Sequence, residues 1–544
     1  MSMLITIVLP LVVAALIAAG GPAARPAWRL VPILPLLLAW PLMAGGRYEP
    51  DWLLFGFTLR VDEVTAVFVV LLGLAWSLAG WQAIRDIDHH QRAFWIGWLL
   101  CLSGMTLATF SADLVGFYLG YVVLSLSAWL MIVQTRSDEA WRAGRIYLVM
   151  ALLGEAAILA AVLLLAGHYG NFELGLLAEG DPERHHIIAR WLLLAGFGIK
   201  LGIIPLHMWL PLAHPAAPVA ASAVLSGVIV KAGLLGCLKL LPRTGLESEA
   251  TGQILFVLGL FTAFGGVLLG LTQQRLKTVL AYSTISQMGL VLVGFSLLYL
   301  VPEPEFGLLS MIGLLVMHHG FNKSALFLAC GNTPGASRIR LLLFALPALA
   351  LVAAPLTTGF LAKHWLKQGV DGLDGASAVY YLLALTSAMT AVLLWKAWQL
   401  ARETDSDPGP VHPAWPVLVV LATLVPWTWA ILADLVYLPD LAGLWDSLWP
   451  LLLAVVLVTV HARWVRFRPN IPEGDVVVLF EALARKLGRL PPGLPSSDPG
   501  RRVMRRLLVR ADVLDRHLKE LPLAGLVILL VGGVLWLLVL MGVV

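Results

Sequence analysis

The 544-residue sequence is poor in charged residues, and this shortage argues against a soluble protein. Only 13% of its residues are charged, whereas a soluble domain usually carries about 25%. Hydrophobic residues make up 59% of the chain, too many for the remaining polar groups to cover in water. We therefore expect lipid to be its solvent and the chain to be an integral membrane protein.

The sequence also lacks the usual motifs that bind metals, clusters and nucleotides. Its three cysteines, Cys101, Cys237 and Cys330, are far apart within apolar runs and form no CxxC pair. A Walker A motif, a glycine-rich dinucleotide turn and a GxSxG elbow are absent as well. We expect no cofactor, no metal, no nucleic-acid partner and no catalytic chemistry of the chain's own.

Long apolar runs are what the sequence has in abundance, and each can cross the roughly 30 Å of a bilayer core. Residues 3–19 have no basic residues before them, so they are expected to form a first span and not a cleavable signal peptide. Sixteen spans are predicted in all: 3–19, 30–44, 63–84, 93–111, 114–134, 143–167, 186–210, 218–241, 252–271, 275–300, 306–331, 340–367, 376–401, 413–436, 448–464 and 523–544. The runs at 30–44 and 448–464 are short.

The charge of successive loops alternates in sign. Loops after odd-numbered spans carry basic residues, as in Arg136–Arg145, and loops after even-numbered spans carry acidic ones, as in Glu173–Glu183. The positive-inside rule then places the odd loops in the cytoplasm and both termini outside. We expect a multi-pass protein of the plasma (inner) membrane with this orientation.

Ionisable residues in the middle of a span cost a few kcal/mol and usually have a function. Six residues are of this kind: Glu155, Lys200, Lys231, His319, Lys323 and Lys363. Burial and neighbouring charges decide together whether such a group holds its proton, so a row of them linked by water can pass protons along. We expect all six to face the bundle interior in one row.

For other ionisable residues a structural role is the alternative. A lysine near the end of a span ordinarily extends to the headgroups, and this describes Lys239, Lys277, Lys367 and Lys396. His207 and His214 stand beside a loop, where packing explains a histidine equally well. His318 points in a different direction from His319 because the two are adjacent on a helix. His318, His207 and Lys277 are kept as additional candidates.

Two prolines predict interrupted helices. Pro205 and Pro355 each remove a backbone donor within a predicted span, close to Lys200 and Lys363. Broken helices at membrane depth occur where they face protein or a wet cavity, as in transporters.

Three stretches carry a resemblance to a known family. PLHMWLPLAHPAAPVAASAVLSGVIVKAG, LKTVLAYSTISQMG and HHGFNKSALFLACG resemble the signatures of the antiporter-like subunits of respiratory complex I, membrane-bound hydrogenases and Mrp-type cation/proton antiporters. The resemblance covers roughly residues 60–400. It implies an all-α fold with a core of about 14 helices and two inverted five-helix repeats, spans 4–8 and 9–13. Helices 7 and 12 would be broken, and about two extra helices would follow at the C-terminal end.

The resemblance also implies roles. Lys200 corresponds to the essential lysine of span 7, Lys231 to the relay lysine of span 8, and Lys363 to the terminal ionisable group of span 12. His319 and Lys323 match the ionisable pair of span 11, and Glu155 falls where some members have an acidic residue in span 6.

One departure from the family stands in span 5. The family has a Trp–Glu pair there whose glutamate pairs with the span 7 lysine, and this chain has Tyr121 and Val122. Glu155 is the only carboxylate deep in spans 4–7, so we predict that it approaches Lys200 directly or through water.

The expected division of the chain is 1–110 for N-terminal spans, 111–250 and 251–405 for two half-channels, and 406–464 for C-terminal spans. A basic segment at 465–521 and a last span at 522–544 follow. Residues 462–521 hold thirteen Lys and Arg. They read equally as a basic linker or as amphipathic helices that dock on anionic lipid or a soluble cytoplasmic partner.

Three functions fit the sequence. The first is a proton-translocating subunit of a multi-subunit complex of Mrp-antiporter or complex I-like type. It would move protons alone or in exchange for a cation, and the complex could be a redox-driven translocase. The second is a channel subunit that powers a soluble partner, such as an inorganic-carbon uptake enzyme. The third is a structural subunit with a degenerate channel, which the missing glutamate leaves open.

Overall fold

The computed structural model describes most of the chain up to residue 478. The described residues are 1–464, except 23, 50–57, 170–173, 175–183, 242–247, 302–306, 333–336, 372, 374 and 404–409, together with 471–474 and 477–478. The chain divides into two compact units, residues 1–473 and 474–544. The predicted basic segment lies almost wholly, and the predicted last span wholly, outside the described residues.

The first unit is built almost entirely of helices. Eleven helical segments in the described part are long and apolar enough to cross a membrane. Ten of them are single α-helices: α1 Ser2–Ala19, α4 Glu63–Asp86, α5 Arg92–Phe110, α6 Leu114–Ile132, α7 Asp138–Tyr169, α13 Ser248–Gly270, α14 Leu276–Leu300, α18 Ala376–Arg402, α19 Ala414–Leu432 and α20 Leu441–Trp464. The eleventh consists of α11 Val219–Val224, the π-helical turn η2 Leu225–Ile229 and α12 Lys231–Leu240.

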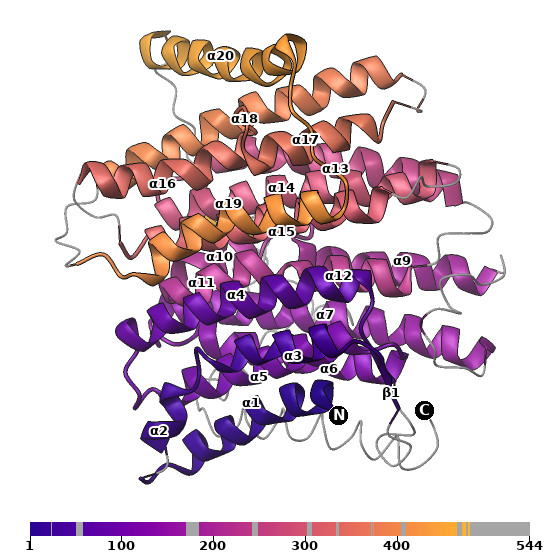
Figure 1. Ribbon diagram of the computed structural model, residues 1–544, viewed down its shortest axis with the longest axis vertical. Coiled ribbons are helices and arrows are strands. Elements are labelled where there is room, and N and C mark those ends of the chain that lie inside the picture. Colours follow the sequence, from indigo (N-terminus) through magenta and orange to yellow (C-terminus); the bar gives the residue numbers. More distant parts are fainter. Residues whose placement is uncertain are drawn as a thin grey trace, which may run out of the picture. The chain divides into compact units, whose positions relative to one another are not determined.

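The remaining described elements are shorter or more polar. They are α2 Ala24–Arg29, the 3-10 helix η1 Leu34–Leu38, α3 Ala39–Ala44, β1 Arg47–Tyr48, β2 Leu59–Arg60, α9 Arg184–Leu201, α10 Leu210–Ala216, α15 Leu308–Ala329, α16 Arg338–Leu351 and α17 Thr358–Gln368. The two strands pair antiparallel, with Arg47 opposite Arg60. Figure 1 shows the helices of this unit side by side in approximate chain order, from α1 to α20.

Most predicted spans coincide with helices, and two differ. The predicted span 30–44 is too long: the helix begins only at Leu34, next to Pro35, and runs from η1 directly into α3 to end at Ala44, which is short for a span. The predicted span 448–464 begins too late: α20 starts at Leu441, so Asp446 lies inside the helix and not in the preceding loop.

The interruptions predicted at Pro205 and Pro355 are both present. One helix stops at Leu201 (α9) and resumes at Leu210 (α10), and the other stops at Leu351 (α16) and resumes at Thr358 (α17). Thr357 caps the second restart, since its hydroxyl accepts the Phe360 N–H at 3.3 Å. Both breaks therefore expose backbone polar groups inside the bundle.

Two helix pairs cross at very short range through glycines. A Cβ added to Gly120 of α6 would lie 2.5 Å from Ala108 N of α5. A Cβ added to Gly289 of α14 would lie 2.5 Å from Ala263 N of α13. Small residues at such crossings let backbones touch in a bilayer. The pairs α5–α6 and α13–α14, which are predicted spans 4–5 and 9–10, thus pack alike.

A third close contact brings the π-helical turn against α15. A Cβ on Gly227 of η2 would lie 1.9 Å from Ser324 Oγ and 2.9 Å from the Gly320 carbonyl oxygen. π-Helical turns often occur at functional sites, and this one directly precedes Lys231. The crossing holds Lys231 close to the polar residues of α15.

Candidate functional site

All six residues predicted to form a polar row are buried in the protein interior. Glu155, Lys200, Lys231, His319, Lys323 and Lys363 are each at most 7% exposed. None of them extends towards lipid, which excludes the headgroup-reaching arrangement for the four lysines. The row is arranged as two clusters.

The first cluster surrounds Lys200 with tyrosines. The Lys200 ammonium donates to the Tyr147 hydroxyl at 3.3 Å, and that hydroxyl donates to the Ser125 carbonyl at 2.7 Å. The same ammonium lies 5.6 Å from the ring centroid of Tyr121 and 5.4 Å from that of Tyr147. Aromatic faces attract a cation at this range, so the two rings stabilise the buried ammonium.

Glu155 belongs to this cluster without touching Lys200. The two charges interact electrostatically, and the Ser125 side chain lies beside the Glu155 carboxylate. Among the described residues no ion pair joins Glu155 to Lys200, and Glu155 Oε2 has no hydrogen-bond partner. The direct form of the predicted contact is therefore not formed. Tyr147, two turns earlier on the same helix α7, occupies the position beside the ammonium.

The second cluster centres on Lys231 and Lys323, whose ammonium groups both bind backbone carbonyls. Lys231 Nζ donates to the Ser226 carbonyl at 2.7 Å, and Lys323 Nζ donates to the Leu280 carbonyl at 3.0 Å. The Ser226 and Thr284 hydroxyls lie 2.7 Å apart, and Thr284 donates to the same Leu280 carbonyl at 3.0 Å. Among the described residues neither ammonium bonds to a hydroxyl, but Lys323 and Thr284 share the Leu280 carbonyl, and Thr284 meets the residue whose carbonyl binds Lys231.

No carboxylate neutralises these two lysines within the part of the chain that the structure describes. They lie close enough to repel one another electrostatically. Repulsion between charges is strong in a medium of low dielectric constant. The charge state of one lysine therefore depends on that of the other.

The adjacent histidines of α15 serve different neighbours. His318 Nδ1 lies 2.9 Å from the Thr358 hydroxyl, at the start of α17. The Asn322 side-chain amide donates to the His318 backbone carbonyl at 2.7 Å. The same amide nitrogen lies 3.2 Å from His318 Nδ1 and so contacts the ring. His319 interacts electrostatically with Lys231 and Lys323, and within the described part its ring nitrogens have no hydrogen-bond partner. His318 thus links the second cluster to the second helix break.

Lys363 lies beyond that break, at a cavity of about 230 Å³. Its ammonium donates to the Thr386 hydroxyl at 2.7 Å, the Ser387 hydroxyl at 2.5 Å and the Leu383 carbonyl at 3.3 Å. His318 is within electrostatic range of Lys363. Lys363 is therefore the last of the six residues along the row.

The two clusters are separated by the packing of α9 on α12. A Cβ on Gly236 of α12 would lie 2.3 Å from the Phe197 ring, and one on Gly233 would lie 2.6 Å from the Phe197 carbonyl oxygen. His207, within the first interruption, is buried with its ring centroid 6.1 Å from that of Tyr282. Within the described part, no hydrogen bond joins the two clusters.

The lysines expected to reach headgroups bind protein instead. Three of them donate to carbonyls at the C-terminal ends of neighbouring helices: Lys239 to Thr109 and Ser111 at 2.6 Å each, Lys277 to Ala217 at 2.6 Å, and Lys396 to Leu271 at 2.7 Å. Such carbonyls lack partners within their own helix and attract a cation. The fourth, Lys367, forms an ion pair with Asp446. His214, next to the Lys277 contact, is buried and stacks on Phe327 with centroids 4.4 Å apart.

Several polar partners in these clusters were not predicted from the sequence. They are Tyr147, Ser226, Thr284, Asn322, Thr358 and Asp446. Serine, threonine and tyrosine are common in membrane helices, and three of the contacts here, Tyr147–Ser125, Thr358–His318 and Ser226–Thr284, join residues 22 to 58 positions apart. Only Asp446 could have been suspected from the sequence, because it is a carboxylate near an apolar run.

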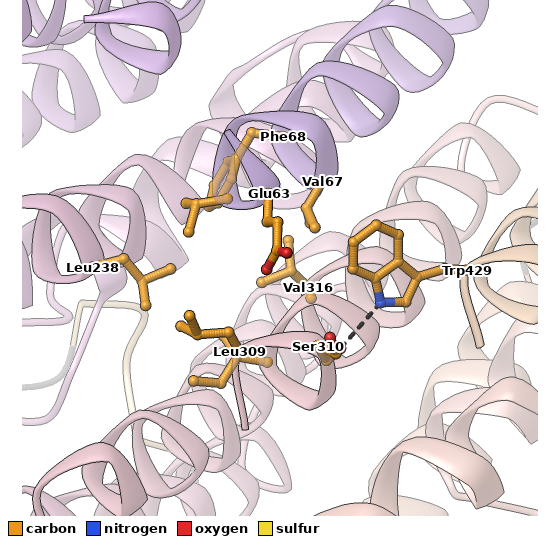
Figure 2. Close-up of a pocket in the computed structure, with 11 residues that line it drawn as sticks. Glu63, Val67, Phe68, Leu238, Leu309, Ser310, Val316 and Trp429 are labelled. Carbon is orange, nitrogen blue, oxygen red and sulfur yellow. Dashed lines mark hydrogen bonds between the residues drawn. The ribbon is translucent and has the colours of Figure 1, made fainter. Parts of the chain in front are cut away.

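Two other places have site-like features and lie apart from the clusters. Figure 2 shows a pocket of about 20 Å³ in which Glu63 is the one labelled carboxylate, surrounded by Phe68, Leu238 and Trp429. The side chains of Asp88, His89 and His90 bring ligand atoms within 4.8 Å of one another, but they are consecutive and largely exposed. Neither feature includes a residue of the two clusters.

Comparison with known proteins gave a matching family model and many relatives, two of which follow. The model described as "NADH:quinone oxidoreductase/Mrp antiporter, TM" matches residues 111–390, just over half of the chain. Hydrogenase-4 component B of Escherichia coli (strain K12) is 29% identical over 381 residues, covering 63% of this chain and 55% of that protein. NAD(P)H-quinone oxidoreductase chain 4 3 of Picosynechococcus sp. is 28% identical over 376 residues, covering 63% and 65%. The chain thus spans less than two thirds of the length of these relatives.

Two solved structures share the fold. The structure of an Mrp complex from Dietzia sp. DQ12-45-1b matches with a TM-score of 0.69 and 19% identity, over 94% of this chain and 61% of that one. The membrane-bound sulfane sulfur reductase, an archaeal respiratory membrane complex, matches with a TM-score of 0.66 and 19% identity, over 84% and 99%.

Proposed function

Because the chain belongs to the NADH:quinone oxidoreductase/Mrp antiporter transmembrane family, we propose that it is a proton-translocating subunit of a multi-subunit membrane complex. Its transport path is the row of buried ionisable residues. Glu155 and Lys200 act in the first cluster, and Lys231, His319, Lys323 and Lys363 act in the second. His318 belongs to the path as well, since it faces Thr358 at the helix break.

The observation that carries this proposal is the buried pair Lys231 and Lys323, which interact electrostatically and bind only backbone carbonyls. Neither has a carboxylate beside it in the described part. A purely structural lysine at this depth gains more from a carboxylate partner, because an unpaired buried charge is costly. Two electrostatically coupled lysines without a fixed counter-ion suit a step in which one lysine releases a proton as the other takes one up through water.

The architecture proposed for this function is a core with two inverted five-helix repeats, predicted spans 4–8 and 9–13. Two features support it. The α5–α6 and α13–α14 pairs both cross closely through glycines, and each repeat contains one interrupted helix. The half-channels then correspond to residues 111–250 and 251–405.

The surroundings of the chain are proposals too. We assign it to the plasma membrane, with the basic loops in the cytoplasm and both termini outside, on the alternation of loop charge. Other membrane subunits are its proposed partners, because hydrogenase-4 component B and the Mrp complex are by name parts of larger assemblies. The basic segment 465–521 is the proposed docking surface for a soluble partner.

Proton movement in membrane vesicles that contain the chain with its partners tests the function. Lys231→Ala and Lys363→Ala are expected to lower the rate at least about tenfold, the effect of raising a barrier by ~1.4 kcal/mol. Lys396→Ala is the matched control, because Lys396 binds the Leu271 carbonyl outside the row. Wild-type rates in both row variants, with normal assembly, would overturn the proposal.

A further inference from the structure

The cavity beside Lys363 extends from the buried interior to the exposed end of α17. Buried Lys363 lines one part of it, and the exposed residues Gln368 and Asp440 line another. The wall comes from α17, α18 and α20. At about 30 Å³ per water molecule in the liquid, its volume of about 230 Å³ accommodates several waters.

An ion pair stands within this cavity, between Lys363 and the exposed residues. Lys367 Nζ lies 2.6 Å from Asp446 Oδ2, and the same nitrogen lies 4.0 Å from the ring centroid of Tyr380. Lys363 and Lys367 are one helical turn apart on α17, hence on one face. The side chain of Lys367 is 7% exposed and that of Asp446 is 26% exposed. The pair is therefore partly shielded from water.

The segment that leads into α20 is also held by contacts other than this ion pair. The segment before α20 is held by Trp365 Nε1, which donates to the Leu435 carbonyl at 2.7 Å, and by Tyr437, whose ring stacks on His364 at 3.6 Å. Asp440 caps the helix by accepting the Gly443 N–H at 2.8 Å. Removing a partly buried ion pair from water costs free energy. Attachment of α20 to α17 alone therefore explains this pair poorly.

We propose that the Lys367–Asp446 ion pair is the outlet gate of the cavity and that Asp446 exchanges a proton with Lys363. This inference rests on the proposed function of the row. A proton passes from Lys363 Nζ through cavity water to a carboxylate oxygen of Asp446. Lys363 is then neutral and Asp446 is a neutral acid, so the attraction to Lys367 is lost.

The neutral acid lets the gate open. Lys367 retains its contact with the Tyr380 ring while Asp446 separates from it. Asp446 then releases the proton to water on the side where α17 ends, and its carboxylate pairs with Lys367 again. Asp446 faces titratable and charged groups from every element packed there: Lys363, His364 and Lys367 of α17, Tyr380 of α18, and Tyr437 and Asp440 before α20.

Accessibility of the cavity tests the gate without any transport assay. Ala384 is buried, lines the cavity and makes no polar contact there, so Ala384→Cys is a suitable probe position. A membrane-impermeant cationic thiol reagent is added from the side where α17 ends, and labelling of the chain without Ala384→Cys gives the background from the three native cysteines. Adding Asp446→Asn is expected to raise the labelling rate about fivefold or more, since the neutral amide removes the ion pair.

Asp440→Asn is the matched control, because it removes a carboxylate from the same cavity and keeps a residue that caps helices well. The labelling rate with Asp440→Asn is expected to equal that of the probe alone. An unchanged rate with Asp446→Asn, or an equal rise with Asp440→Asn, overturns the gate.

Transport separates this inference from the function on which it rests. Asp446→Asn is expected to lower proton movement about tenfold, and Asp446→Glu to restore most of it, because glutamate can carry the proton. If Asp446→Asn is labelled faster but the wild-type complex moves no protons, the gate is supported and the proposed function is contradicted. Normal proton movement and normal labelling with Asp446→Asn overturn the gate and leave the function standing.

Discussion

Buried lysines in this chain are stabilised mainly by dipoles and aromatic rings. Lys200 binds a tyrosine hydroxyl between two rings, while Lys231 and Lys323 bind backbone carbonyls. Hydroxyl and carbonyl oxygens accept hydrogen bonds from the ammonium group. They stabilise the positive charge of the lysine less than a carboxylate would. Such an environment stabilises a buried lysine and leaves it free to release its proton, as the proposed function requires.

At Glu155 we predict a loss of transport that a second carboxylate can repair. Glu155→Gln removes the one charge that acts on Lys200 from within the first cluster, so proton movement should fall at least about tenfold. Adding Val122→Glu should recover part of it, because Val122 is a buried position of neighbouring helix α6. Proton uptake by vesicles measures both. Normal uptake with Glu155→Gln alone would show that Glu155 is structural.

The Tyr147 hydroxyl gives a second prediction with a control in the same cluster. Tyr147→Phe keeps the ring but removes the contacts to Lys200 and the Ser125 carbonyl, so transport should fall about tenfold, equivalent to ~1.4 kcal/mol. Tyr121→Phe also keeps its ring, and the hydroxyl it removes has no hydrogen-bond partner in the described part. Its transport rate should match the wild type. Equal rates for the two variants would contradict the role of Tyr147.

The six ionisable residues of the row could be predicted from the sequence, but their partners could not. A charge within an apolar span is a strong signal because it is costly there. Thr284 and Ser226 give no such signal, since a hydroxyl can bind its own helix. Glu155 and Tyr147 lie about two turns apart on one helix. Which of them reaches Lys200 depends on the directions of the side chains, which the sequence does not give.

Helices in this fold are defined as much by their breaks and crossings as by their apolar runs. Pro205 and Pro355 predicted the two interruptions, because proline has no backbone N–H to donate within a helix. The π-helical turn at 225–229 has no proline and was not foreseen. The N-terminal run 30–44 is apolar throughout, but its helix extends only from Leu34 to Ala44.

Gly227→Ala tests the crossing that positions Lys231. The new methyl group would collide with Ser324 Oγ and the Gly320 carbonyl, so stability should fall by ~1–3 kcal/mol and transport should fall with it. Gly80→Ala is the control, since the nearest atom to its added Cβ is 3.5 Å away. Thermal unfolding in detergent and proton uptake measure the effects. A Gly227→Ala protein as stable and active as Gly80→Ala would contradict the importance of this crossing.

The first unit combines two polar clusters with helices that carry apolar side chains on their outer faces. Val257 and Phe261 of α13, for example, are exposed, while the row stays buried. The sequence resemblance over residues 60–400 was confirmed as family membership by the match at 111–390. The repeats, the sidedness and the partners stay predictions, because they depend on inversion symmetry and on chains other than this one.

The central claim is that protons cross the membrane through the buried lysines. The most direct measurement is proton flux into liposomes that contain the purified complex with either the wild-type chain or Lys323→Ala, with Lys396→Ala as the matched lysine variant. We predict wild-type flux with Lys396→Ala and a loss of at least about tenfold with Lys323→Ala, in complexes of equal assembly. Undiminished flux with Lys323→Ala would contradict the account.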